Sequence, residues 1–338
     1  MHKPVFLFVI YLKQKLFFCK IGLPSKMKAR YNYFMEINKV GIIKGGDENY
    51  EFSIKKGGEI FSHIFENLSS KWKPLDIFID KKGNWHLSGI PIDPKSLRDK
   101  VDVVWNLAHP AFSAFLKDLS IPVIGPDSFS HYLKHNRKIL EKHLKNAGFK
   151  MPKSIIFPAY QKDFDGPENE YAILKAKEVH GKFGAPWIVR TYIKNDDMGI
   201  HVAKTFPELV EAIKNGLKTK ESILVEELIS GRPVSVHLVK GFRGKEKYVF
   251  PISIGKKSFL NADEKEKIIQ LVNKLHSYLN SEYYFNAHFL VASRDKIYVT
   301  HISFHPELHS KSHFFKACEL VGAKTHHVID HMLSKVRV

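Results

Sequence analysis

The stretch from Phe183 to Val239, FGAPWIVRTYIKNDDMGIHVAKTFPELVEAIKNGLKTKESILVEELISGRPVSVHLV, decides the fold. In it a strand-like WIVR and a short IHVA precede an amphipathic helix, PELVEAIKNGL, and a second apolar strand, ILVEEL. This order is typical of an α+β layer and differs from a dinucleotide-binding βαβ unit. An ordinary layer without a ligand is the alternative interpretation of this stretch taken alone.

The second strand of this stretch ends in Glu226, Glu227, Leu228 and Ile229. At a domain junction, backbone amide and carbonyl groups can hydrogen-bond a planar ring while apolar side chains sandwich it. The sequence therefore predicts a nucleotide site here, with adenine as the candidate ring.

Composition bounds the class of protein. A chain of 338 residues with 44% hydrophobic content is expected to form two or three packed units. Only Cys19 and Cys318 are present, so no disulfide framework or cysteine zinc pattern exists and a reducing, cytoplasmic setting is expected. The net charge of +18 attracts phosphates, nucleic acid or anionic lipid. Because the lysines are scattered and no recognition motif accompanies them, nucleic-acid binding is kept only as an alternative.

The first 34 residues contain an apolar run, VFLFVIYL, that is too short to span a bilayer and is followed by Lys13 and Lys15. We expect no membrane span, and interpret residues 1–34 as a disordered or mis-started extension, with a membrane-surface anchor as the alternative. The predicted units are an amino-terminal substrate-type α/β domain over residues 35–127, a central domain over 128–232 and a carboxy-terminal domain over 233–338.

From Lys39 onward, strand-like and helix-like segments alternate, which predicts a small Rossmann-like parallel sheet. The turn at Gly45 and Gly46 and the later His109 resemble the amino-terminal domain of the D-alanine–D-alanine ligases, within the ATP-grasp superfamily. The resemblance covers roughly residues 37–335 and implies an ATP-grasp fold combining α/β and α+β units. It also implies ATP-dependent carboxylate-amine ligation through an acyl phosphate, for peptidoglycan synthesis.

Two departures lie in the amino-terminal part. The resemblance places an acidic residue that orients the first D-alanine in a loop that is shorter here, which leaves Glu48 or Asn49 near that place. The segment from Pro110 to Ala114 replaces the family's glycine-rich acidic segment with a shortened apolar bridge. Both departures argue against recognition of D-alanine.

The resemblance also implies nucleotide contacts. Arg137 and Arg190 lie where the family has two nucleotide-contacting lysines; two ordinary surface arginines are the alternative. The loop from Lys194 to Gly199, KNDDMG, lies where the family has a small-residue phosphate cover. Its Asp196 and Asp197 would bring negative charge toward a triphosphate.

Two carboxy-terminal strands, FNAHFLVA and KIYVTHISF, are joined through Ser293–Lys296. If this turn is a four-residue loop, His288 lies directly across from His301, with Cβ atoms roughly 4.5–5.5 Å apart. The resemblance implies an Asp, a Glu and an Asn that bind Mg²⁺ at the positions held here by His288, His301 and Ser303. The family's transition-state Arg aligns with Asn286.

Imidazole is a poor ligand for Mg²⁺, and phosphoryl transfer in this family depends on hard cations held by carboxylates. We therefore predict a diverged, weakly active or inactive protein. Retained ATP binding is one role left open for it, and a role as a scaffold, a homodimer or a partner of an active ligase is another. A working ligase with altered metal and amino-acid substrate use is the alternative, and a basic nucleic-acid-binding protein is another. For the histidines, a transition-metal site at His288 and His301, with His305 added, and direct pairing of protonated imidazole with phosphate both stay open.

Overall fold

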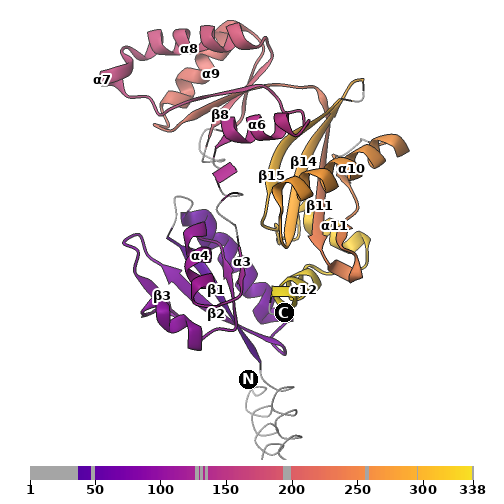
Figure 1. Cartoon of the computed structure of the whole chain (residues 1–338). Helices are drawn as coiled ribbons and strands as arrows, with labels where there is room; N and C mark the ends of the chain where they lie inside the picture. The colour runs from indigo at the N-terminus through magenta and orange to yellow at the C-terminus, as the bar shows by residue number, and fades with distance from the viewer. Residues whose placement is uncertain are drawn as a thin grey trace, which may run out of the picture.

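The computed structural model describes residues 37–46, 50–125, 129, 132–133, 136–192, 199–255, 259–294 and 296–336. The expected extension and the candidate residues Glu48, Asn49 and Lys194 lie outside them. Three sheets form the framework of the described part (Figure 1).

The first sheet has six strands in the order β4-β3-β2-β1-β5-β6. The strands are β1 (Asn38–Gly45), β2 (Trp72–Ile79), β3 (Trp85–Leu87), β4 (Ile90–Pro91), β5 (Val103–Asn106) and β6 (Val123–Ile124). Strands β2, β1, β5 and β6 run parallel, whereas β3 and β4 add an antiparallel hairpin at one edge. The apolar run in β1 is buried on both faces, as is usual for a central parallel strand. The predicted Rossmann-like parallel sheet is thus confirmed.

The helices of this part are α3 (Tyr50–Asn67), η1 (Pro94–Asp99) and α4 (Pro110–Asp118). The predicted apolar bridge from Pro110 to Ala114 is in fact the first part of α4. The His109 Nδ1 atom caps this helix by accepting a hydrogen bond from the Ala111 amide at 3.2 Å, and proline suits a first helical position because its missing N–H has no partner there.

The second sheet is antiparallel, in the order β7-β10-β8-β9. Its strands are β7 (Ser154–Phe157), β8 (Trp187–Thr191), β9 (His201–Ala203) and β10 (Ile223–Glu227). Its helices are α7 (Lys162–Asp165), α8 (Glu168–Lys182) and α9 (Phe206–Leu217), of which α8 and α9 lie together on one side of the sheet (Figure 1). The predicted strand, helix and strand of the opening stretch are confirmed. Thr205 caps α9 by accepting a hydrogen bond from the Glu208 amide at 3.4 Å.

The third sheet has the order β12-β11-β14-β15, with β13 also paired to β11. Its strands are β11 (Gly231–Lys240), β12 (Lys247–Val249), β13 (Ser253–Ile254), β14 (Tyr284–Ala292) and β15 (Ile297–Ser303), with η2 (Phe242–Gly244) between the first two. Helix α10 (Ala262–Leu279) covers one face through Ile268, Val272 and Leu275, which are fully buried. Leu271 of the same helix is half-buried and packs against this core.

Helix α6 (Arg137–Asn146) lies between the second and third sheets in Figure 1. The helix begins after Asn136, whose Oδ1 accepts a hydrogen bond from the Ile139 amide at 3.4 Å. Because Leu140 and Leu144 pack into the core of the third sheet, Arg137 is held at the start of a fixed helix.

The carboxy-terminal helices α11 (His313–Leu320) and α12 (Thr325–Val336) complete the chain, and α12 packs beside α3 (Figure 1). Asp330 of α12 accepts hydrogen bonds from Trp72 Nε1 at 2.7 Å and pairs with the Lys71 ammonium at 2.8 Å. These contacts fasten the end of the chain to the first sheet. Within the described ranges, none of the helices has the length and apolar character that crossing a membrane requires.

Candidate functional site

Residues 228–230 link the second sheet to the third, since β10 ends at Glu227 and β11 begins at Gly231. The Glu227 amide donates a hydrogen bond to the Lys153 carbonyl, and the Leu228 amide donates one to the Pro186 carbonyl, both at 2.9 Å. Leu228 and Ile229 are half-buried. The four residues predicted to hold a planar ring therefore lie at a fixed junction between two sheets.

Three charged side chains meet beside this link. Arg137 Nη2 lies 2.6 Å from Glu226 Oε1, and Arg190 Nη2 lies 3.3 Å from Glu226 Oε2. We call Arg137, Arg190 and Glu226 the junction cluster. The side chains of Arg137 and Glu226 are only 8% and 12% exposed, so the interpretation of Arg137 as a surface arginine is wrong. Two guanidinium groups share one carboxylate, which leaves the junction cluster with a net positive charge.

Arg137 also connects the junction cluster to the third sheet. Its Nη1 donates a hydrogen bond to the Thr300 carbonyl at 3.1 Å, and its backbone amide donates to the Tyr192 hydroxyl at 2.8 Å. Its Nε atom is buried and has no hydrogen-bond partner among the described residues. A buried guanidinium N–H without a partner is uncommon, because desolvating it is costly, and it is suited to an anionic ligand.

Glu141 lies near the junction cluster on helix α6. Burial raises the pKa of its carboxyl group, and the nearby Arg137 opposes that shift. Glu141 thus places a second carboxyl group near the two guanidinium groups of the junction cluster.

His288 and His301 are direct cross-strand partners, as predicted. Their ring centroids are 5.5 Å apart and the ring planes are inclined by 73°. The prediction assumed a four-residue loop and therefore one constant register along the hairpin. That assumption was only partly right, because the register shifts after His288, so that Phe289 pairs with Val299. Thr300 is the extra residue of this β-bulge, and its Oγ1 donates a hydrogen bond to the His288 carbonyl at 3.2 Å.

A continuous row of hydrogen bonds runs across β11 and β14 to His288. We call it the polar chain; its members are Tyr284, His237, Ser235, Asn286 and His288. Tyr284 and His237 are 2.7 Å apart, and His237 and Ser235 are 3.3 Å apart, between their hydrogen-bonding atoms. The contacts from Ser235 to Asn286 and from Asn286 to His288 are both 3.2 Å long. The first four residues are between 1% and 4% exposed, so the row is sealed from water along most of its length.

The polar chain has one consistent direction. Because the Ser235 hydroxyl donates to Asn286 Oδ1, it accepts from His237 Nε2, which must carry the proton. The other nitrogen of a neutral His237 then accepts from the Tyr284 hydroxyl. At the far end, the Asn286 amide donates to His288 Nε2 and occupies the lone pair of that nitrogen.

Burial keeps this row uncharged. It lowers the pKa of His237 from 6.5 to about 3, with smaller lowering effects from His288 and His313. Burial also lowers the pKa of His288, against the opposing effect of Glu307. At neutral pH both imidazoles are therefore neutral. The lowered pKa of His288 does not favour the hypothesis that a protonated imidazole pairs with phosphate, which stays a prediction.

The positions that the resemblance assigns to magnesium do not fit that ion. His288 and His301 offer imidazole nitrogen, which Mg²⁺ binds poorly, and the lone pair of His288 Nε2 is already engaged. The Ser303 hydroxyl donates to the His305 carbonyl at 3.2 Å and accepts from the His305 amide at 3.3 Å. Within the described ranges, no three His, Cys, Asp or Glu side chains form a group that could hold a metal, so the site that added His305 is not formed.

Gly199 is the described end of the predicted phosphate-covering loop. Its φ of +70° is a conformation that favours glycine, and an added Cβ would meet nothing within 4 Å. Sequence reasoning missed Ser235, His237 and Tyr284. The signal was present in VSVHLV, where two polar residues alternate with apolar ones in a strand otherwise suited to burial.

No protein-family model matches the chain. Among curated proteins, a D-alanine–D-alanine ligase of Oceanobacillus iheyensis is 24% identical over 241 residues, which is 58% of this chain and 62% of that protein. The chain thus matches just under two thirds of the length of this relative. Among solved structures, D-alanyl-alanine synthetase A of Vibrio cholerae has a TM-score of 0.69 and 15% identity, covering 90% of this chain and 99% of that one.

A second solved structure, the D-alanine–D-alanine ligase of Bacillus anthracis complexed with ATP, has a TM-score of 0.62 and 18% identity and covers 89% of this chain and 98% of that one. The chain therefore has the ATP-grasp fold of these ligases and is a diverged relative of them.

Proposed function

We propose that this protein binds ATP at the junction of its second and third sheets and has weak or no magnesium-dependent ligase activity. The observation that carries the proposal is the hydrogen bond from Asn286 to His288 Nε2, at the end of a buried and uncharged row. His288 lies at the position where the resemblance implies a carboxylate that holds Mg²⁺. A neutral row cannot supply the negative charge that such an ion requires.

The nucleotide part of the proposal is supported by the junction cluster. Arg137 and Arg190 bring two guanidinium groups to one carboxylate, and Arg137 Nε is buried without a partner among the described residues. Phosphate oxygens would accept hydrogen bonds from these groups. The half-buried Leu228 and Ile229 would contact the adenine ring. The Bacillus anthracis ligase, which has the same fold, was solved with ATP.

The expectation of weak or no ligase activity rests on the residues that stand where the resemblance implies magnesium ligands. In phosphoryl transfer, charge accumulates on the phosphate oxygens and is stabilised by cations and fixed donors. Here Arg137 and Arg190 can orient a nucleotide, and the buried row can exclude water. Neither provides a carboxylate for a divalent cation beside His288. We therefore expect binding without efficient turnover.

Isothermal titration of the full chain with ATP, with and without MgCl₂, tests the proposal. We expect saturable binding whose Kd changes less than about threefold on adding Mg²⁺, and no D-alanine-dependent phosphate release. Arg190→Met should weaken binding about tenfold, which corresponds to one charged hydrogen bond. Arg98→Met, an exposed arginine of the first part of the chain, is the matched control. Strongly Mg²⁺-dependent binding followed by rapid phosphate release would contradict the proposal.

One observation favours the alternative of a working ligase with altered metal and substrate use, namely the opposed imidazoles of His288 and His301 with ring centroids 5.5 Å apart. Imidazole nitrogen suits Zn²⁺ or Ni²⁺ better than Mg²⁺. Under this alternative, phosphate release would appear with Zn²⁺ or Ni²⁺ and disappear in His301→Ala.

A metal-binding readout separates the two functions without relying on turnover. The triple variant His288→Asp, His301→Glu and Ser303→Asn restores the oxygen ligands implied by the resemblance. We expect this variant to bind Mn²⁺ measurably by electron paramagnetic resonance, whereas the natural chain does not. Equal Mn²⁺ binding by both would show that the imidazoles already hold a metal.

A cytoplasmic setting is also proposed, since Cys318 is a buried free thiol.

A further inference from the structure

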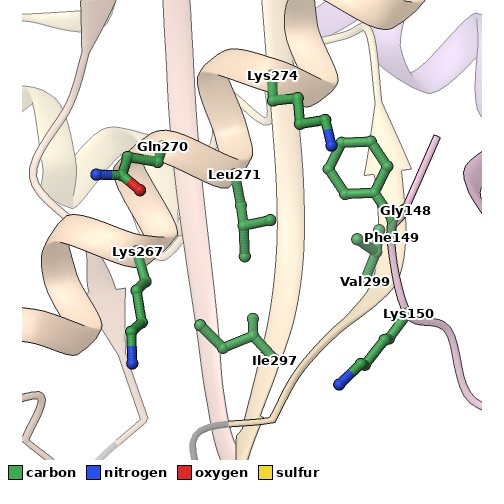
Figure 2. Close-up of a pocket in the computed structure, with 9 residues that line it drawn as sticks. All are labelled: Gly148, Phe149, Lys150, Lys267, Gln270, Leu271, Lys274, Ile297 and Val299. Carbon is green, nitrogen blue, oxygen red and sulfur yellow. The ribbon is translucent and has the colours of Figure 1, made fainter.

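A hollow of about 330 Å³ lies at the edge of the third sheet, away from the junction cluster. Figure 2 shows that it is lined by residues of helix α10, of strand β15 and of the segment Gly148–Lys150 that follows helix α6. Its volume falls at the lower end of the range of small-molecule sites, about 300–1,000 Å³.

The hollow is separated from the polar chain by the sheet itself. Val299, in its wall, packs into the core beneath α10 and pairs with Phe289. His288, the next residue along β14, belongs to the opposite face, because successive side chains of a strand alternate between faces. The hollow and the polar chain therefore lie on opposite faces of the sheet, and Arg137, Arg190 and Glu226 are not among the residues that line the hollow.

The wall combines positive charge with apolar surface. Lys150, Lys267 and Lys274 line it, and Leu271 and Ile297 contribute apolar area between them. Figure 2 shows Lys150 and Lys267 on opposite sides of Ile297. Among the described residues that line the hollow, none carries a carboxylate. The local field thus favours an anion.

Part of this arrangement is fixed before any ligand arrives. The Lys150 carbonyl accepts a hydrogen bond from the Val299 amide at 2.8 Å, which holds the segment against β15. The Lys274 ammonium lies 5.2 Å from the centroid of the Phe149 ring, within cation–π range. Gly148 has a φ of +82°, which lets the chain turn sharply there.

We propose that this hollow binds a small organic anion whose charged group is bound by lysine side chains of the wall and whose apolar body rests on Leu271, Ile297 and Phe149. An aryl or branched alkyl phosphate or carboxylate has this chemistry. Inorganic phosphate lacks the apolar body, and a neutral aromatic alcohol lacks the charge, so the proposal requires both parts together.

Nuclear magnetic resonance titration of the full chain with phenyl phosphate, without nucleotide, tests the proposal. We expect the methyl signals of Leu271, Ile297 and Val299 to shift and saturate, with a Kd on the order of 1 mM or tighter. Inorganic phosphate and benzyl alcohol should each bind at least tenfold more weakly. Equal binding of either probe, or shifts that do not saturate, would overturn the proposal.

Variants of exposed lysines locate the charge without endangering the fold. The double change Lys150→Gln and Lys274→Gln should weaken phenyl phosphate binding at least tenfold. Lys265→Gln, on the same helix but outside the hollow, should leave it unchanged. If both variants behave alike, the anion is attracted only by the general positive charge of the chain, and no site exists. Because ATP is absent, this result is independent of the proposed nucleotide function.

Discussion

The junction cluster and the polar chain lie next to each other and differ in how their buried polar groups are stabilised. In the junction cluster, Arg137, Arg190 and Glu226 keep their charges by pairing. In the polar chain, the imidazole of His237 gives up its charge, because burial lowers its pKa to about 3. Thr300 joins the two regions, since its carbonyl accepts from Arg137 and its hydroxyl donates to the His288 carbonyl.

The difference suggests which functions survive divergence. A cluster with net positive charge, in which Arg137 Nε has no hydrogen-bond partner among the described residues, is suited to an anion such as a nucleotide. A neutral row that satisfies its own hydrogen bonds is stable without a ligand and offers little to a cation. The comparison can be tested by breaking each region separately.

The largest effect is expected from Glu226→Ala, which leaves two guanidinium groups beside each other without their shared carboxylate. Breaking a buried ion pair by removing one partner costs about 3–5 kcal/mol of folding free energy. Urea denaturation at pH 7 measures it. Glu227→Ala on the same strand is the control: its carboxylate accepts one long hydrogen bond, 3.4 Å from the Lys153 amide. A loss there should stay below about 1 kcal/mol. Equal losses would mean that the pairing in the junction cluster has no special weight.

A smaller, pH-dependent effect is expected from the polar chain. The unfolded chain protonates His237 below about pH 6.5, whereas the folded protein keeps it neutral down to about pH 3. Its stabilising contribution is therefore fully present above pH 6.5 and is lost as the pH falls toward 3. The slope is about 1.4 kcal/mol per pH unit, or about 2 kcal/mol between pH 6.5 and 5. His276, whose pKa burial lowers to about 4, adds to this loss.

Urea denaturation of His237→Gln across pH 7 to 5 isolates this contribution. Gln cannot titrate, so the variant should be destabilised at pH 7 by about 1–3 kcal/mol through its altered hydrogen bonds, yet lose less stability on acidification than the natural chain. His309→Gln, an exposed histidine, should keep the natural pH dependence. An unchanged slope in His237→Gln would show that this imidazole does not stay neutral in the folded state.

The smallest effect is expected from His301→Ala. His301 is exposed, and its backbone, not its side chain, determines the cross-strand pairing with His288. The change should cost less than about 1 kcal/mol in the same denaturation assay. A cost of several kcal/mol would indicate that the two imidazoles act as one unit and would favour the metal-binding alternative.

The fold was largely predictable because apolar periodicity reports which face of each element is buried. The sequence around Trp187 and Leu209 correctly indicated a strand and a helix, and both residues are buried in one core. Local caps were less predictable. Asn136 caps α6, and Leu140 and Leu144 of this helix pack against the third sheet; residue type alone indicates neither contact.

The candidate site was predictable in part. Alignment of the hairpin correctly paired His288 with His301, although the bulge at Thr300 was not expected from the spacing. The prediction that His305 adds to this pair as a third metal ligand was wrong, because the backbone of His305 is hydrogen-bonded to the Ser303 side chain. The row through His237 requires knowledge that β11 lies beside β14 in one register, and that pairing joins residues about fifty positions apart.

The sequence by itself determined the strands, the helices and the substitutions at the positions that resemble a magnesium site, because these depend on residue type and local spacing. Only the tertiary structure decided the charges. Burial neutralises His237, and three separate segments bring Arg137, Arg190 and Glu226 within hydrogen-bonding distance. The physical reason is that a pKa or an ion pair depends on the surroundings of a group in space, and those surroundings come from parts of the chain that are distant in sequence.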